Sequence, residues 1–384
     1  MKHRIPFAFY FFYFAAASFS MPFFILYYEG LGYNGAKIGL LAGIVPLVIM
    51  VGAPIWTRLA DAKYCHQLVM GVTTGITIVI AIIFPLFKDF SLILPLSILY
   101  AFFVSPIMPL ADSATIHMLG SEKNLYGRVR LGGTLGWGMT ALLSGYIIQT
   151  YGTRWVFWGY GLIMVIVLFI SQKFTYPSKV EAGASGGDWK GAFVNHQWMV
   201  FLLLSFIAGV GLTTINSFLS PYLKELNISQ SFMGIALMIS IVGELPVMFY
   251  SNHLLKRYGA FLLLIIATAM TAFRLLLYAG VNSTQGILGF QLLNGLTFPL
   301  FLVAAVTHTN DISPEGMKAT GQGIMNAVAS GVGPAIGGFF CGLLMGSIGG
   351  QAMFFIIGSI LLVGVISIFA FERKRSIRPQ QTTG

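Results

Sequence analysis

Long apolar runs alternate with short polar or glycine-rich breaks along almost the whole chain. A helix needs roughly 20 mostly apolar residues to cross a bilayer, and the runs repeatedly reach that length. The pattern therefore predicts an all-α membrane protein with twelve transmembrane helices. Their expected ranges are 7–28, 36–59, 67–87, 91–118, 127–149, 154–174, 198–223, 229–254, 260–281, 285–310, 317–345 and 350–371.

The composition excludes a soluble protein. Of the 384 residues, 57% are hydrophobic and 9% are charged, and the mean hydropathy is +0.82. Soluble domains carry about 25% charged residues, so most of this surface must face lipid. The two cysteines, Cys65 and Cys341, have no nearby ligand motif, and we expect no disulfide framework, metal or cofactor.

The net charge of +10 is explained by topology. With a cytoplasmic N-terminus, seventeen basic residues fall in loops on that side and four, Lys37, Lys88, Arg154 and Lys224, fall in the opposite loops. This asymmetry is the positive-inside pattern. It predicts a multi-pass protein of the plasma (cell inner) membrane with both termini in the cytoplasm, and it makes nucleic-acid binding unnecessary.

A polar interval at the midpoint divides the chain. We expect a six-helix bundle at 1–174, a cytoplasmic linker at 175–197, a second six-helix bundle at 198–372 and a cytoplasmic tail at 373–384.

Weak internal repeats connect the two bundles. Gly52 and Asp61 recur as Gly243 and Asn252, 191 positions later. Such a duplication is typical of transporters with two pseudo-symmetric bundles and a central site.

Glycines at four-residue spacing predict close helix contacts in three spans. They are Gly35, Gly39 and Gly43 in span 2, Gly132 and Gly136 in span 5, and Gly333 and Gly337 in span 11. Gating contacts between the bundles and static packing are both consistent with this spacing.

Five ionisable residues fall inside the predicted spans: Asp112, Arg128, Arg130, Glu244 and Arg274. Each costs about 3 kcal/mol near the bilayer centre, so we expect them to face a central cavity. Static ion pairs, Asp112 with either neighbouring arginine and Glu244 with Arg274, are the alternative interpretation.

Two helix faces carry polar groups suited to a solute. Arg130, Thr134 and Trp137 share one face of span 5, which suits a ligand with hydroxyls or a carboxylate on an apolar ring. The alternative is that Trp137 only packs the bundle. Asn294 and Thr297 share a face of span 10, as cavity hydrogen-bonders or as contacts between helices.

Around these residues the chain resembles the lactose permease type of the major facilitator superfamily and its phenylpropionate permease relatives. The resemblance lies in Asp112, sixteen residues before Arg128, and in Gly127-Arg128-Val129-Arg130 followed by Thr134 and Trp137. It implies that Asp112 and Arg130 hydrogen-bond a sugar and that Trp137 stacks on it.

In the second half, Gly243-Glu244 resembles the acid of the family's eighth span, and Arg274 resembles the arginine of its ninth. The resemblance implies that Glu244 binds substrate and couples it to protonation, with Arg274 beside it. Asn294 and Thr297 replace the histidine and glutamate of the family's tenth span, so the usual proton acceptor is missing.

The cytoplasmic gate is expected at Asp61 and Arg128. The family's loop signature between spans 2 and 3 is only partly kept, with Gly52 and Asp61 present and its terminal basic pair reduced to Lys63.

These observations predict a secondary active transporter, a proton-coupled symporter of a small sugar-like solute that works by alternating access. Asp112, Arg130, Trp137, Glu244 and Asn294 are expected to bind the solute. Glu244 is the expected proton acceptor, with Asp112 second, and movement of Arg274 relative to Glu244 controls protonation. The expected partners are the solute, the proton and the lipid bilayer, and we expect a monomer.

Other functions remain open at this point. The cargo is alternatively an aromatic monocarboxylate or a nucleoside, or the chain is an efflux antiporter. An enzyme is disfavoured because no catalytic constellation is visible, and a channel because no filter-like repeat is visible.

Overall fold

The computed structural model describes residues 3–176, 195–281, 283–314 and 317–377, and all regular structure within them is helical. The first eight α-helices are α1 (Arg4–Ser20), α2 (Phe24–Gly30), α3 (Gly35–Lys63), α4 (His66–Ile83), α5 (Phe90–Val104), α6 (Ile107–Leu119), α7 (Tyr126–Tyr151) and α8 (Trp155–Ser171). Short 3-10 helices, η1 (Phe84–Leu86) and η2 (Gly120–Leu125), follow α4 and α6.

The later helices are α10 (His196–Glu225), α11 (Gln230–Tyr258), α12 (Ala260–Gly280), α13 (Thr284–Gln291), α14 (Phe298–Ile312), α15 (Lys318–Asn326) and α16 (Gly333–Ile377). A 3-10 turn, η3 (Leu292–Leu296), joins α13 to α14, and a π-helical turn, η4 (Ala327–Val332), joins α15 to α16. The predicted linker falls largely on 177–194, outside the described residues, as do residues 378–384 of the predicted tail.

The polar breaks in the sequence supply the caps that begin several helices. The side chain of Asn34 accepts a hydrogen bond from the Lys37 amide at the start of α3 (3.0 Å). Ser229 caps α11 and Ser283 caps α13 in the same way. These side chains satisfy amide groups that the first turn of a helix leaves unpaired.

Three predicted spans are interrupted helices. Met21, Pro22 and Phe23 separate α1 from α2, and Ser105 and Pro106 separate α5 from α6. Proline lacks the amide hydrogen that continues a helix, which accounts for these two breaks. The third break, at residues 292–297, lies between α13 and α14 and begins three residues after Gly289.

Nine helices in the described residues are long and apolar enough to cross a membrane. α8 is a shorter apolar helix of 17 residues, and α7 is outside the nine. The stretch Thr320–Lys374 is one of the nine helices. Within it, Gly349 (φ 82°) bends α16 between the predicted spans 317–345 and 350–371. The all-helical membrane fold is confirmed, and the number of twelve crossings stays a prediction.

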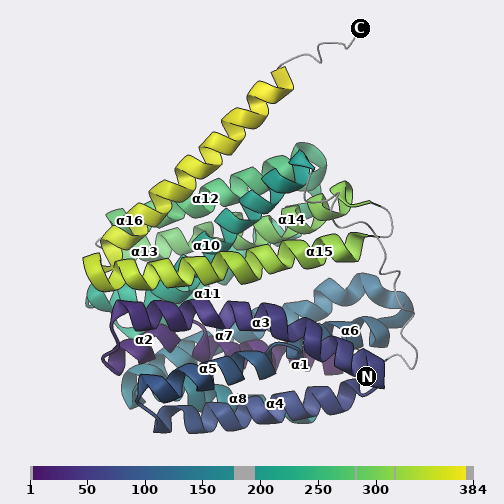
Figure 1. Ribbon diagram of the computed structural model, residues 1–384, viewed down its shortest axis with the longest axis vertical. Coiled ribbons are helices and arrows are strands. Elements are labelled where there is room, and N and C mark those ends of the chain that lie inside the picture. The colour runs from purple at the N-terminus through teal and green to yellow at the C-terminus, as the bar shows by residue number, and fades with distance from the viewer. Residues whose placement is uncertain (1–2, 177–194, 282, 315–316, 378–384) are drawn as a thin grey trace.

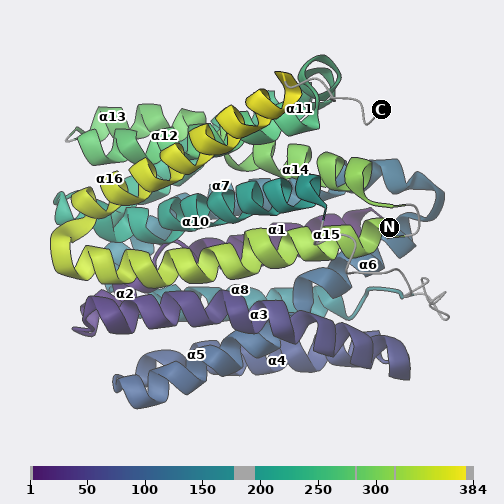
Figure 2. The same ribbon diagram turned by 45° about the horizontal axis from the view of Figure 1, so that its top comes forward.

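The helices form two groups that lie against each other. In Figure 1, α1–α8 occupy the lower part and α10–α16 the upper part, with N on the right and α2 on the left. The turned view in Figure 2 also shows α3 beside the first part of α16. Contacts between the groups are made chiefly by α3 with α16 and by α7 with α11.

The backbones of the two helix groups approach each other most closely at the end away from the start of α1. A Cβ on Gly39 would lie 2.5 Å from the Phe339 carbonyl oxygen, and one on Gly342 would lie 2.4 Å from Gly39 Cα. Across α7 and α11, a Cβ on Gly145 would lie 2.5 Å from the Gln230 carbonyl oxygen. Only a hydrogen fits at these positions, so the groups are in backbone contact at this end.

Polar contacts between the two groups lie at the same end. Lys224 Nζ is 3.3 Å from Glu29 Oε2, and the Ser231 amide donates to Gln149 Oε1 at 3.0 Å. Among the described residues, these are the hydrogen bonds that join one group to the other. The molecule is thus closed at the end away from the start of α1.

The predicted glycine positions divide between two kinds of contact. Those in α3 face the other helix group, as described above. Gly132 and Gly136 instead face the carbonyl oxygens of Phe7 and Phe11 in α1, within their own group. Gly333 and Gly337 likewise face α10. A gating role is therefore consistent with the glycines of α3 and is not supported for the other two pairs.

Replacing Gly39 with alanine should weaken the contact between α3 and α16. Because the added methyl meets backbone that cannot rotate away, we expect about 1–3 kcal/mol lower stability, measured as thermal unfolding of the purified protein in detergent. Gly75→Ala in α4 is the control, since nothing lies within 4 Å of a Cβ there. Equal melting temperatures for the two variants would contradict this contact.

Candidate functional site

Arg274 in α12 is the largest fully buried side chain, with 1% of its surface exposed. Its Nε donates to the hydroxyl of Tyr278 (3.1 Å), one turn along the same helix. Nη1 donates to Asn294 Oδ1 (2.7 Å) and Thr297 Oγ1 (3.3 Å), and Nη2 donates to Gln291 Oε1 (2.6 Å). Neutral oxygens therefore take up four of the five N–H donors of this guanidinium.

The acceptors come from the interruption between α13 and α14. Gln291 is the last residue of α13, Asn294 lies in η3, and Thr297 has non-helical backbone angles (φ −104°, ψ −90°). Side chains three residues apart share one face of a helix, and in a 3-10 turn such as η3 they eclipse one another, whereas in an α-helix side chains six residues apart drift around the axis. The break gathers them on one guanidinium.

Glu244 in α11 reaches Arg274 through an amide. Asn294 Nδ2 donates to Glu244 Oε1 at 2.6 Å, while Asn294 Oδ1 accepts from Arg274. The direct Glu244–Arg274 ion pair considered from the sequence is wrong, since no such pair forms within 4 Å. A guanidinium only donates and a carboxylate only accepts, so an amide fits between them in one orientation.

In the first helix group, tyrosines hold Asp112. The Tyr10 hydroxyl donates to Asp112 Oδ1 at 2.6 Å, and the Tyr126 hydroxyl donates to the same oxygen at 3.0 Å. Neither Arg128 nor Arg130 forms an ion pair with this carboxylate, so the pairing considered from the sequence is wrong here too. Two phenol groups now supply the hydrogen bonds expected from an arginine.

Arg130 is held by aromatic rings instead of an acid. Its guanidinium carbon lies 4.8 Å from the centroid of the Tyr10 ring and 4.3 Å from that of Phe14. Gly133 leaves the space for this arrangement, because a Cβ there would lie 2.8 Å from Arg130 Nη1. Rings that cover the faces of a guanidinium leave its N–H edges for other partners.

The N–H edges of Arg130 have no acceptor within the part of the chain that the structure describes. The side chain is half-buried, as are Thr134 and Trp137 further along α7. The two arginines therefore differ: Arg274 is fully buried and uses four of its five N–H donors, whereas Arg130 is positioned with its donors unused. A half-buried cation in this state can bind an oxygen-rich or anionic solute.

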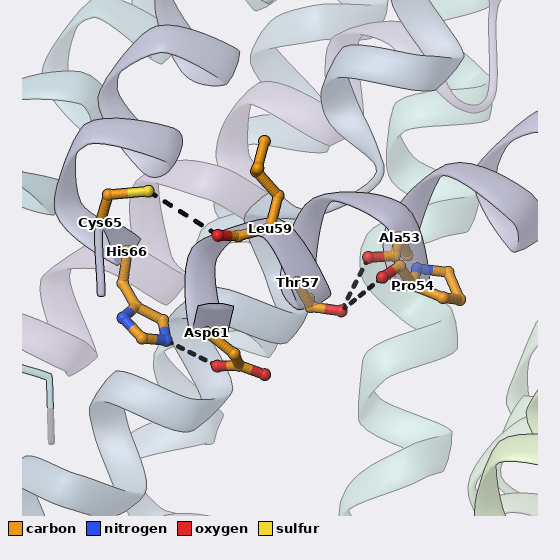
Figure 3. Close-up of polar contacts among 7 residues, drawn as sticks. All are labelled: Ala53, Pro54, Thr57, Leu59, Asp61, Cys65 and His66. Carbon is orange, nitrogen blue, oxygen red and sulfur yellow. Dashed lines mark hydrogen bonds and ion pairs between the residues drawn. The ribbon is translucent and has the colours of Figure 1, made fainter. Parts of the chain in front are cut away.

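The two residues of the predicted cytoplasmic gate lie in different surroundings. Asp61, near the end of α3, has its Oδ1 2.7 Å from Nε2 of His66, at the start of α4 (Figure 3). The chain turns between them at Tyr64, whose φ is 51°. Arg128 is exposed on α7 and makes no ion pair with Asp61 in these described segments. Asp61 therefore ties two consecutive helices together.

Four residues of the two clusters were missed in the sequence: Tyr10, Tyr126, Tyr278 and Gln291. The sequence contained a signal for two of them, because each stands one helical turn from a predicted residue: Gln291 from Asn294, and Tyr278 from Arg274. Tyr10 had none, since the first apolar run contains many aromatic residues.

A family model described as the MFS_1 like family matches residues 7–357 of the chain. The chain is 24% identical over 350 residues to the maltose permease of Geobacillus stearothermophilus, covering 89% of this chain and 88% of that one. It is 23% identical over 341 residues to the probable 3-phenylpropionic acid transporter of Escherichia coli K12, covering 87% and 89%. These relatives are transporters and not enzymes.

Among solved structures, the fold is similar to that of the nucleoside transporter NupG. The TM-score is 0.83 at 16% sequence identity, and the match covers 97% of this chain and 99% of that one.

Replacing Gln291 with leucine should destabilise the protein, because Arg274 Nη2 then loses its acceptor in a fully buried position. We expect a loss of about 1–3 kcal/mol in the free energy of unfolding. Gln285→Leu, at an exposed position of the same helix, is the matched control. The measurement is thermal unfolding of both variants in the same detergent. An unchanged melting temperature for Gln291→Leu would show that this hydrogen bond does not stabilise the buried charge.

Proposed function

Since the chain belongs to the MFS_1 like family of major facilitator superfamily transporters, we propose that it is a proton-coupled symporter of a small sugar-like solute. It works by alternating access in the plasma (cell inner) membrane, as a monomer with both termini in the cytoplasm. The bundles are 1–174 and 198–372, joined by a cytoplasmic linker at 175–197. The end closed by glycine contacts then faces the outside.

The observation that carries this proposal is the amide bridge between Glu244 and Arg274. A protonated carboxyl group keeps a carbonyl oxygen that accepts hydrogen bonds. Glu244 can therefore take a proton on Oε2 while Oε1 still accepts from Asn294. If Glu244 instead formed a direct ion pair with the buried arginine, protonation of Glu244 would remove one of the two charges of that pair. Glu244 is thus suited to bind and release a proton without disrupting its surroundings.

Asp112, Arg130 and Trp137 are the proposed solute ligands. Arg130 offers unused N–H donors, Asp112 has a second carboxylate oxygen, Oδ2, and Trp137 supplies an apolar face. Asn294 bridges Glu244 and Arg274, and the second N–H of its amide is available to a solute. In this assignment Asp61 supports the turn between α3 and α4, and Arg128 is available to the cytoplasmic gate.

Proton coupling provides enough energy for uptake against a gradient. One charge moving down 100 mV yields about 2.3 kcal/mol. At 1.36 kcal/mol per tenfold change, this corresponds to roughly fifty-fold accumulation of the solute.

A second cargo, an aromatic monocarboxylate, is favoured by one observation. Arg130 lies half-buried without an acidic partner among the described residues, and a solute carboxylate would provide one. A relative named for 3-phenylpropionic acid transport agrees with this alternative.

The cargo is tested by recording external pH in weakly buffered, de-energised vesicles that contain the protein. We expect transient alkalinisation when a neutral sugar is added on the proposed outer side, because proton and solute enter together. Vesicles without the protein are the control. Alkalinisation with aromatic acids alone would establish the second cargo, and no response to either class would refute proton symport.

Glu244→Gln should abolish uphill accumulation while solute exchange continues, because glutamine keeps the size and hydrogen bonding of the side chain but cannot take the proton. The accumulation ratio should fall from up to roughly fifty-fold to about one. Glu122→Gln, an exposed glutamate outside the clusters, should leave the ratio unchanged. Full accumulation by Glu244→Gln would exclude Glu244 as the proton acceptor.

A further inference from the structure

The interrupted turn between α13 and α14 is pressed against α11 by two glycines. A Cβ on Gly243 would lie 2.2 Å from the Leu292 carbonyl oxygen, and a Cβ on Gly295 would lie 2.0 Å from the Gly243 carbonyl oxygen. Both distances are far below ordinary contact, and in both cases the neighbouring atom is backbone. Neither side can give way by changing a rotamer, so only glycine fits at the two positions.

This contact lies directly beside the hydrogen bond that joins the two elements. Glu244 follows Gly243 in the chain, and Asn294 precedes Gly295. The Asn294–Glu244 bond (2.6 Å) is therefore one residue away from the backbone contact on both of its sides. A displacement of α11 by the width of a methyl group would lengthen this bond beyond hydrogen-bonding distance.

The first helix group contains a related contact without the carboxylate. Gly52 of α3 lies against Ser105 and Phe102, at the break between α5 and α6. There the nearest atom to a Cβ is the Ser105 hydroxyl at 2.7 Å, and the Phe102 carbonyl oxygen is 3.4 Å away. The residue after Gly52 is Ala53, which has no polar side chain. Of these two contacts, the tighter one is therefore the one beside Glu244, whose carboxylate has to be held in position.

We propose that Gly243 and Gly295 are positioning residues for proton coupling. Their backbone contact fixes the distance from Glu244 to Asn294, and thereby connects Glu244 to the charge of Arg274. Neither glycine touches the solute or the proton. The proposal rests on the proposed role of Glu244 as proton acceptor.

The test compares Gly295→Ala and Gly243→Ala with Gly289→Ala. Gly289 lies in α13, where nothing is within 4 Å of a Cβ, so it controls for the change of residue type in the same span. The solute is the one that gives a pH response in vesicles. For each variant, membrane-inserted protein is quantified, and uphill accumulation and solute exchange are measured separately.

We expect Gly295→Ala and Gly243→Ala to lose accumulation by about tenfold or more while exchange persists, because misplacement by about 1 Å can cost about a hundredfold where a reaction depends on exact geometry. Gly289→Ala should retain both activities. In the Glu244→Gln background accumulation is already about one, so the measurement there is solute exchange, which Gly295→Ala should leave unchanged, since interacting residues are non-additive. A purely structural role would reduce exchange and accumulation together, with or without Glu244.

Each other outcome refutes part of the scheme. Full accumulation by both glycine variants, together with its loss in Glu244→Gln, would overturn the positioning role and leave the proton acceptor intact. Full accumulation by Glu244→Gln would remove the proposed function itself. Failure of both glycine variants to reach the membrane, while Gly289→Ala does so, would show that the contact serves folding alone.

Discussion

The buried charge of Arg274 is the constraint on which the second helix group depends. A guanidinium removed from water needs acceptors for its N–H groups, and a bilayer provides none. The chain meets this need by interrupting a helix, so that Gln291, Asn294 and Thr297 converge on one side chain. The irregular backbone is backed by α11, against which Gly295 packs. The same interruption places an amide next to Glu244.

Hydropathy alone predicted the helical fold, since length and apolarity decide whether a segment can cross a bilayer. It did not predict the interruptions at 21–23, 105–106 and 292–297, because each lies within a run that is long and apolar enough to be a single span. Pro22 and Pro106 were visible signals for two of the breaks. The third lies at the contact between Gly243 and Gly295, which joins segments distant in the chain.

The ionisable residues of the site were found from the sequence because their cost in lipid marks them out. Their partners were not found, since an acid in a bundle can be satisfied by any donor that packing brings near. Tyr10 and Tyr126 take the place of an arginine at Asp112, and His66 is the partner of Asp61. Asn294 stands between Glu244 and Arg274. At Asp112 and at Glu244, an uncharged group occupies the place where opposite charges suggested a direct pair.

The backbone contact between α3 and α16 has a consequence for the energy of opening. The hydrophobic penalty of separating two surfaces in water grows with the apolar area that becomes exposed. At Gly35, Gly39, Gly342 and Gly346 the facing surfaces carry no side chains, so little such area is hidden between them. At these four positions water is excluded by direct backbone contact. In the proposed transport cycle, these contacts can therefore open and close again with little change in the exposed apolar area.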